Sequence, residues 1–210
     1  MSNGTSLKLK EEKPHYLGHR KRMREKLLKF GSSAFADYEI LEMLLFSSIP
    51  RDDVRPLAKK LLNNFGSLSK ILSASQNELK SIDGVGDAVI ANIRVVQEIL
   101  VRSLRDDIEK KVVISSWKAL LDYCRATMIH SKTEQFRIFF LDTKNQLIAD
   151  EQQQQGTIDH TPVYPREIVK RALELGALSI ILAHNHPSGD PSPSKMDIDV
   201  TRKIIEAAKP

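Results

Sequence analysis

The sequence predicts a protein of two parts, an all-helical N-terminal region followed by an α/β region. Three observations support this prediction. Apolar residues recur at helical spacings over residues 15–104, whereas short runs of β-forming residues appear only in the second half. Charge divides in the same way, because residues 1–105 contain 18 basic and 12 acidic residues and residues 106–210 contain 14 and 15. A chain of 210 residues is long enough for two small domains.

A mixed-charge stretch, residues 106–111, separates the two regions. We expect it to be a linker or the exposed end of a helix. The expected organisation is therefore a polar, disordered tail over residues 1–14, a helical domain over residues 15–105, and a second domain over residues 112–210.

The helical domain is divided by residues that begin or end helices. We expect Asp37 to cap a helix that ends at residues 47–50, because the residue before a proline avoids the helical conformation. The next helix begins near Val54 and is expected to end at Gly66. A long helix is then expected over residues 88–104.

The second domain is expected to alternate helices with strands. Its apolar run at residues 179–183 predicts a central strand, since strands covered on both faces are apolar throughout. This order of elements is typical of α/β domains, in which functional side chains lie at strand ends. The expected elements are helices at residues 117–128, 165–175 and from about Lys195, a strand at residues 136–141, and a return strand from Gln146 through the glutamines 152–155 to Gly156.

Several classes of protein are excluded by composition. No apolar run approaches the ~18 residues that a membrane-spanning helix needs, and the polar first thirty residues contain no secretory signal. The single cysteine, Cys124, excludes a disulfide framework and a cysteine-rich zinc site, and we expect it to be a core residue. These features predict a cytoplasmic protein without a membrane partner.

The excess positive charge predicts where a polyanion would bind. The formal net charge is +5 and the isoelectric point is about 9.2. Residues 19–29 carry six lysines and arginines against one glutamate, and on a helix they form a basic stripe able to neutralise DNA phosphates. A solvated helix face has the same composition, so both interpretations stay open. The DNA contacts predicted from this stripe are Arg20, Lys21, Arg22 and Arg24.

Gly84 and Gly86 predict a tight turn between two helices, of the helix-hairpin-helix type. Backbone N–H groups at the start of the following helix suit a phosphate. Against this, Asp83 and Asp87 flank the glycines and repel phosphate. The turn is therefore predicted with one of two roles, as a contact to duplex DNA or as a connection that binds nothing.

The strongest candidate for chemistry follows the apolar run at residues 179–183. His184 and His186 are two residues apart, so on a strand their side chains point to the same face. The proline- and glycine-rich loop after them can bring Asp197 back to the same place. Two imidazoles and one carboxylate suit zinc and leave a fourth position for water. An alternative stays open, because Ser194 and Asp197 also fit the S-x-x-[DE] pattern of a helix capping box.

These residues show a resemblance to a known family. H-x-H-P at residues 184–187 is followed by S-x-x-D at residues 194–197, with seven residues between the second histidine and the serine, and this pattern matches the JAMM motif of the JAB/MPN+ metalloproteases. The longer string H-N-H-P-S-G-D-P resembles the RadC family of bacterial MPN proteins. Nearly the whole chain from about His15 takes part in the resemblance, through further segments at residues 18–22, 37–42, 140–145, 156–157 and 165–168.

The resemblance implies a JAB/MPN fold, a cytidine-deaminase-like sheet with helices, and one zinc ion per chain. It implies that His184, His186 and Asp197 are the zinc ligands and that Ser194 hydrogen-bonds the oxyanion of the reaction. The family also uses a glutamate before its first core strand as a general base. Glu134 is the expected base, and Glu151 is the alternative.

Two functions remain as hypotheses. The first is a zinc-dependent metallohydrolase that cleaves a peptide or isopeptide bond in a peptide or protein substrate. The second is a DNA-binding protein of repair or recombination whose zinc site is structural or vestigial. Family members continue beyond the position of Pro210, thirteen residues after Asp197, so we expect the second domain to be truncated at its C-terminus.

Overall fold

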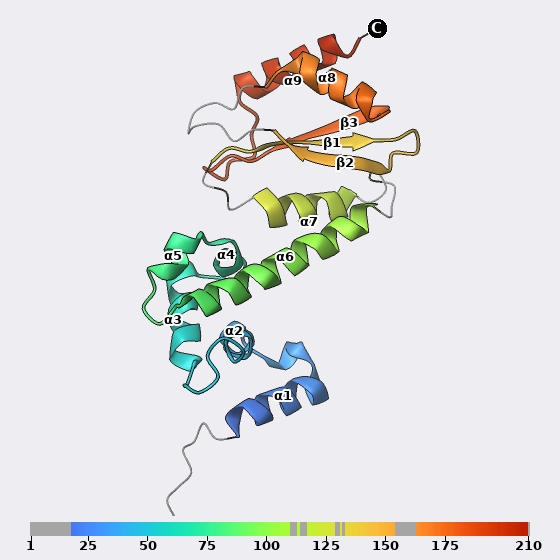
Figure 1. Ribbon diagram of the computed structural model, residues 1–210. Helices are drawn as coiled ribbons and strands as arrows, with labels where there is room; N and C mark the ends of the chain where they lie inside the picture. Colours follow the sequence, from blue (N-terminus) through green and yellow to red (C-terminus); the bar gives the residue numbers. More distant parts are fainter. Residues whose placement is uncertain are drawn as a thin grey trace, which may run out of the picture. The chain divides into compact units, whose positions relative to one another are not determined.

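The computed structural model describes residues 18–109, 113, 117–128, 131, 133–153 and 163–209 (Figure 1). They form two compact units that divide between Arg94 and Val95. The tail predicted over residues 1–14 lies outside the described residues, as do residues 110 and 111 of the predicted linker. None of the described helices is long and apolar enough to cross a bilayer.

The described residues of the N-terminal unit form helices and their connections, around a single apolar core. Leu45, Leu61 and Leu79 are fully buried in this core. Gly66 ends the third helix in the left-handed conformation with φ +82°, as the sequence predicted. The elements are α1 (His19–Phe30), η1 (Ser32–Ala34), α2 (Asp37–Leu45), α3 (Arg55–Phe65), α4 (Leu68–Ser73), α5 (Gln76–Lys80) and the first part of α6 (Asp87–Glu109).

Two helix ends differ from the sequence prediction. Asp37 is the first residue of α2 and not its cap. The N–H of Ala36 donates to Glu39 Oε2 at 2.9 Å, so the carboxylate of the third helical residue satisfies the start of this helix. α6 continues to Glu109, beyond the helix predicted over residues 88–104, so residues 106–109 form the end of a helix, one of the two alternatives for this stretch. Ile108 explains this extension, because it is fully buried in the C-terminal unit and its packing stabilises the extra turn.

The C-terminal unit is a three-stranded antiparallel sheet with helices on both faces (Figure 1). β1 lies between β2 and β3. This is the α/β layering that the sequence predicted. The elements are α7 (Trp117–Met128), β1 (Phe136–Leu141), β2 (Leu147–Gln152), α8 (Pro165–Glu174), β3 (Ser179–His184) and α9 (Lys195–Ala207).

β1 supplies core residues to both faces of the sheet. Phe139 packs with α7, whereas Phe140 packs with α8 and α9, because alternate residues of a strand point to opposite faces. Cys124 of α7 packs against the first of these cores, as expected of a core residue. Burial raises the pKa of the Cys124 thiol to about 11, so this thiol stays protonated at neutral pH.

β3 lies at an edge of the described sheet, whereas the sequence predicted a central strand. Both faces of β3 are nevertheless covered, since Ile181 packs with the core beside α7 and Ile180 with the core beside α8 and α9. An uninterrupted apolar run therefore reports cover on both faces and not the position of a strand within a sheet. β2 ends at Gln152, and the predicted continuation from residue 154 lies outside the described residues.

The pairing of β1 with β3 positions the candidate site. The two strands are antiparallel, and Phe136 at the start of β1 pairs with His184 at the end of β3. Residues just before β1 and residues just after β3 therefore lie at the same end of the sheet.

Candidate metal centre

The three predicted metal ligands lie together at the end of β3. His184 Nε2 is 2.8 Å from His186 Nε2. Asp197 Oδ2 is 3.2 Å from His184 Nε2 and 3.4 Å from His186 Nε2. A tetrahedral zinc ion with ligands at ~2.0–2.1 Å places its ligand atoms about 3.3 Å apart. The spacing of these three atoms is close to that arrangement.

The loop after β3 orients His186. The N–H of Gly189 donates to the His186 carbonyl at 2.8 Å, in a turn where Gly189 has φ +80°. The same turn brings the Asp190 carbonyl oxygen within 2.6 Å of His186 Nδ1. Because a carbonyl oxygen only accepts, Nδ1 carries a proton in this contact, which leaves Nε2 as the ring nitrogen that faces the other two ligands.

Asp197 takes part in two interactions at once. As the third residue of α9, it accepts a hydrogen bond at Oδ2 from the Ser194 N–H at 2.6 Å, and its own N–H donates to Ser194 Oγ at 3.2 Å. This is the capping box that the sequence left as the alternative, and it coexists with the histidine contacts. Burial alone would raise the pKa of Asp197, but the Ser194 hydrogen bonds and the two histidines outweigh it and hold that pKa below its usual range. The carboxylate is therefore ionised near neutral pH, as cation binding requires.

The composition of the cluster fits a divalent metal ion. Its three side chains are between 15% and 27% exposed and present electron-pair donors within 4.8 Å of one another. Within the described ranges, no lysine or arginine forms an ion pair with Asp197. Two imidazole nitrogens and one carboxylate oxygen are ligands that zinc accepts, with one coordination position left open.

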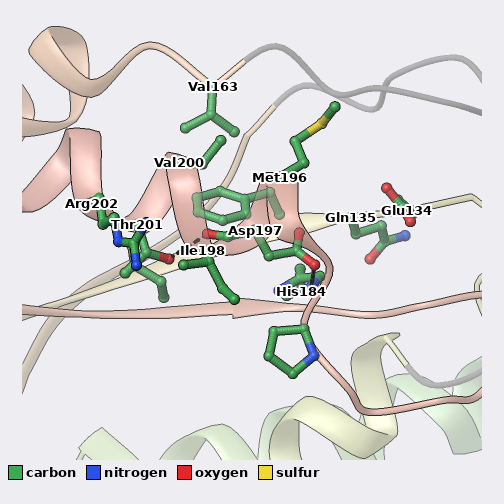
Figure 2. Close-up of a pocket in the computed structure, with 13 residues that line it drawn as sticks. Glu134, Gln135, Val163, His184, Met196, Asp197, Ile198, Val200, Thr201 and Arg202 are labelled. Atoms are coloured by element: carbon green, nitrogen blue, oxygen red, sulfur yellow. Dashed lines mark hydrogen bonds and ion pairs between the residues drawn. The ribbon is translucent and has the colours of Figure 1, made fainter.

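A cavity of about 400 Å³ opens beside the ligands (Figure 2). Its walls are largely apolar side chains of β1, β3 and α9, and His184, Asp197 and Glu134 all line it. Figure 2 shows Glu134 at one side of the cavity, next to Gln135. The Glu134 carboxylate makes no hydrogen bond or ion pair with another described residue.

Glu151, the alternative base, lies elsewhere. It belongs to β2, and its Oε1 accepts hydrogen bonds from Arg171 Nε at 2.9 Å and from a terminal guanidinium nitrogen at 2.7 Å. It is not among the residues that line the cavity. The structure therefore brings Glu134, and not Glu151, to the cavity of the predicted ligands.

Asn185 is part of the site and was not predicted. It lies between the two histidines, and its Oδ1 accepts from the Gln135 N–H at 2.9 Å. Its Nδ2 donates to the Thr133 carbonyl at 3.2 Å. The single signal in the sequence was its position inside H-x-H.

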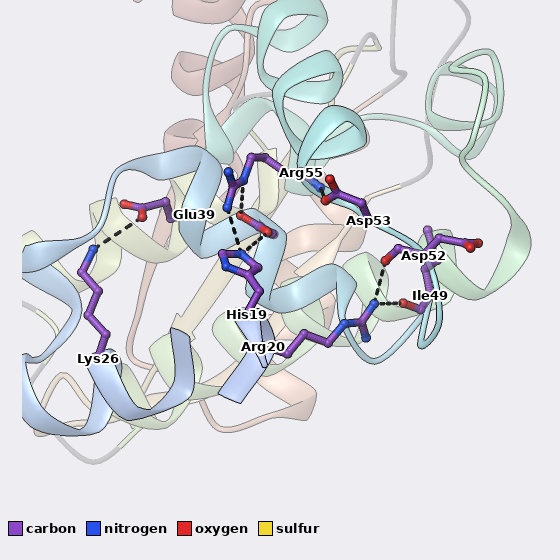
Figure 3. A network of polar contacts seen from close by, with 9 residues as sticks. His19, Arg20, Lys26, Glu39, Ile49, Asp52, Asp53 and Arg55 are labelled. Atoms are coloured by element: carbon purple, nitrogen blue, oxygen red, sulfur yellow. Dashed lines mark hydrogen bonds and ion pairs between the residues drawn. The ribbon is translucent and has the colours of Figure 1, made fainter. Parts of the chain in front are cut away.

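The predicted DNA contacts of α1 have different surroundings: Arg20 is hydrogen-bonded within the chain, and the others are exposed. The Arg20 guanidinium donates to the carbonyl oxygens of Phe46, Ile49 and Asp52 at 2.8, 2.5 and 2.9 Å, and Figure 3 shows the bonds to Ile49 and Asp52. Arg20 therefore ties α1 to the connection between α2 and α3, and its role as a DNA contact stays a prediction. The other predicted contacts on α1 are exposed: Lys21, Arg22 and Arg24.

The predicted turn connects α5 to α6. Gly84 has φ +93°, and a Cβ at this position would lie 3.3 Å from the side chain of Leu57, so glycine suits the turn for two reasons. The flanking acids are paired, Asp83 with Lys60 at 3.2 Å and Asp87 with Lys80 at 3.5 Å. These ion pairs reduce the repulsion that the sequence set against phosphate.

A helical unit followed by an α/β unit, with an H-x-H and S-x-x-D cluster at a strand end, defines a JAB-domain protein. Residues 114–210 match the family model of the RadC-like JAB domain, and residues 16–91 match the model of the UPF0758 N-terminal domain. The chain belongs to this UPF0758 family of RadC-like proteins. It is 54% identical over 197 residues to a UPF0758 protein of Ruegeria pomeroyi, and the match covers 93% of this chain and 88% of the relative. The resemblance drawn from the motifs is thereby confirmed.

Proposed function

We propose that this protein is a zinc-dependent hydrolase that cleaves a peptide or isopeptide bond in a peptide or protein substrate. The observation that supports the proposal is the cluster of two imidazole nitrogens and one carboxylate oxygen beside a cavity that Glu134 also lines. His184, His186 and Asp197 would hold the zinc ion. Three protein ligands with one open position are typical of catalytic sites, whereas structural zinc sites have four protein ligands.

Zinc, when bound, supplies Lewis-acid activation of water and of the substrate carbonyl. The proton transfers are the task of the chain's own residues. Glu134 accepts a proton from the attacking water as the new C–O bond forms, and returns it to the amine nitrogen as the C–N bond breaks. The Glu134 carboxylate suits this role because no other described side chain holds it in an ion pair.

Ser194 would stabilise the oxyanion. Its Oγ accepts the Asp197 N–H at 3.2 Å, which leaves the hydroxyl proton available for donation. A donor fixed in a helix cap needs little reorganisation when negative charge develops on the carbonyl oxygen. The capping box would thus orient a ligand and an oxyanion donor together.

Metal analysis and peptide hydrolysis test the proposal. We expect about one zinc ion per wild-type chain, and none in the His184→Ala/His186→Ala double variant. Glu134→Gln should keep its zinc and lose turnover by about 10²- to 10⁴-fold. Glu151→Gln is the matched control and should keep both, because Glu151 pairs with Arg171 outside the cavity. A folded wild-type chain without zinc, or full turnover by Glu134→Gln, would contradict the proposal.

We also propose that the N-terminal unit binds duplex DNA. The exposed side chains of Lys21 and Arg24, and the Gly84 turn with its paired acids, support this second function. We expect the full chain to bind duplex DNA with a strong salt dependence, and Lys21→Gln/Arg24→Gln to weaken binding and reduce the salt slope by about two. Fluorescence anisotropy at several salt concentrations measures both. An unchanged slope in the double variant would contradict this assignment.

A further inference from the structure

The side chain of Asn185 joins two segments at the candidate metal centre. It projects from the chain between the two histidine ligands. Its Oδ1 accepts from the Gln135 N–H at 2.9 Å, and its Nδ2 donates to the Thr133 carbonyl at 3.2 Å, with a longer contact of 3.5 Å to the Ser131 carbonyl. The two shorter bonds are made to the backbone groups on either side of Glu134.

The two hydrogen bonds to the backbone on either side of Glu134 require a short side chain with one acceptor and one donor, which asparagine provides. The Gln135 N–H needs an acceptor, and the Thr133 carbonyl can accept a second hydrogen bond beside that of the Ser131 hydroxyl; the Asn185 amide supplies both groups in one plane. Aspartate has no donor at neutral pH, and alanine has neither group. Glutamine has the same amide but is longer by one methylene.

The segment before β1, residues 133–135, depends on the hydrogen bonds of Asn185 because the backbone pairing of β1 with β3 does not include it. The described pairing of β1 with β3 begins at Phe136, opposite His184. The Ser131 hydroxyl donates to the Thr133 carbonyl at 2.7 Å, but this bond lies within the segment and does not reach β3. Among the described residues, the Asn185 amide therefore supplies the side-chain hydrogen bonds that connect the segment around Glu134 to the histidines.

We infer that Asn185 is a positioning residue that fixes the Glu134 backbone relative to the two histidines. The inference rests on the proposed function, in which Glu134 is the general base. Side chains two residues apart on an extended chain point to the same face. If the chain stays extended before β1, Glu134 lies on the same face as Phe136 and as His184, the residue paired with Phe136. A general base must come within about 2.6–3.2 Å of the proton that it moves, and a displacement of about 1 Å costs about 10²-fold in rate. Asn185 acts on the reaction through Glu134.

The first test needs no substrate. Hydrogen exchange at the Gln135 amide is measured by NMR on the full chain, without metal, for wild type and Asn185→Ala. Loss of the hydrogen bond should speed this exchange by about 10-fold. Asn92→Ala is the matched control, because the Asn92 amide donates to the Leu44 carbonyl at 2.8 Å and to Ser47 Oγ at 2.9 Å in the N-terminal unit. It should leave exchange at Gln135 unchanged.

Two further readouts separate positioning from simple support of the fold. With Co²⁺ in place of zinc, the paramagnetic shift of the Gln135 amide reports its position relative to the metal, and it should change in Asn185→Ala while Co²⁺ affinity stays within about threefold of wild type. In peptide hydrolysis, kcat should fall about 10²-fold with KM within about twofold. Adding Glu134→Gln to Asn185→Ala should cost no more than Glu134→Gln alone, since both act on one step. Asn185→Leu has a similar side-chain volume and neither hydrogen-bonding group, and it replaces Asn185→Ala if that variant does not fold, with the same expected losses.

The outcomes distinguish this inference from the proposed function. Wild-type exchange and Co²⁺ shift at Gln135 in the Asn185 variants would overturn the inference and leave the proposed function intact. Faster exchange with unchanged kcat would also overturn it, because Asn185 would then support the fold and not the base. A wild-type chain that binds no Co²⁺ would overturn the proposed function, and the positioning role with it.

Discussion

Each unit of the molecule contains a cluster of histidine and carboxylate, and the two clusters are completed in different ways. In the N-terminal unit, His19 Nε2 lies 2.7 Å from Glu42 Oε1, and Arg55 Nε lies 3.5 Å from Glu42 Oε2 (Figure 3). In the C-terminal unit, Asp197 faces two histidines, and the described ranges supply it with no lysine or arginine. The first cluster contains its own permanent cation, and the second does not.

The two clusters obtain their compensating positive charge from different sources. The Glu42 side chain is 1% exposed, so its charge must be balanced within the chain, and Arg55 provides that balance. The Asp197 side chain is 26% exposed and lines a cavity, so a cation can reach it from solvent. The same residue types therefore stabilise the fold in one unit and form a candidate metal site in the other.

The largest effect is expected from the metal itself. Zinc in about 1,000-fold excess over its Kd should stabilise the protein by about 4 kcal/mol through mass action, and a chelator should abolish this gain. His184→Ala/His186→Ala should remove the response, whereas His19→Ala should keep it. Thermal unfolding with zinc or with chelator measures the difference. A response that survives in the double variant, or vanishes in His19→Ala, would contradict the assignment of the metal site to the Asp197 cluster.

Glu42→Gln should have the next largest effect, on stability without metal. It removes the carboxylate charge between His19 and Arg55 and should cost about 2–3 kcal/mol, below the ~3–5 kcal/mol of a fully buried pair because Arg55 is 46% exposed. Asp197→Asn in the presence of chelator is the counterpart and should cost less than about 1 kcal/mol, because asparagine also caps helices well. Urea unfolding compares them. Equal losses would show that both clusters are structural.

The sequence predicted elements with strong local signals better than it predicted their arrangement. β1 and α7 have the expected bounds, because one is a run of β-forming residues and the other has helical periodicity. The place of β3 in the sheet was not predictable, since its apolar residues report burial on two faces and not strand order. The end of α6 was missed because Ile108 is buried by tertiary packing, which a mixed-charge stretch does not reveal.

The same distinction explains which site residues were predicted. His184, His186 and Asp197 lie within one strand, loop and helix, so their spacing in the sequence fixes their spacing in the structure. The carbonyl partners of Arg20 were not predicted because they lie between 26 and 32 residues away, and a run of charge does not identify such partners. Asn185 was missed for the same reason, since its partner segment lies about fifty residues earlier.

Two glycines offer a smaller and closely matched test. Gly189 and Gly66 have φ +80° and +82°, and a Cβ at either would meet no atom within 4 Å, so alanine at either position should cost about 1–2 kcal/mol in backbone strain alone. Gly189→Ala should also lower zinc affinity about 10-fold, because it disturbs the turn that holds the Asp190 carbonyl on His186. Gly66→Ala should leave zinc affinity unchanged. Competition with a chelating dye measures affinity, and equal effects of the two variants would contradict the role of this turn.

The smallest effect concerns the two carboxylates that cap helices, Glu39 in α2 and Asp197 in α9. The N–H of Ala36 donates to Glu39 and, with help from Lys26, outweighs burial and holds the pKa of Glu39 below its usual range. A carboxyl group whose pKa is lower in the folded state stabilises the protein fully above the pKa of the unfolded chain, and this stability is lost as the pH falls through the folded-state pKa.

Glu39→Ala should therefore cost about 1 kcal/mol at pH 7, and less as the pH is lowered toward 3. Urea unfolding of both proteins across this range measures the cost. Glu25→Ala is the control, because Glu25 makes an exposed contact with Lys21 at 3.7 Å, and its smaller cost sets the baseline for losing a surface carboxylate. A cost that stays constant with pH would mean that Glu39 supports α2 by packing and not by its charge. Since the Asp197 carboxylate likewise accepts the N–H of the cap residue, Ser194, that result would also weaken the view that this bond helps to keep the metal ligand ionised.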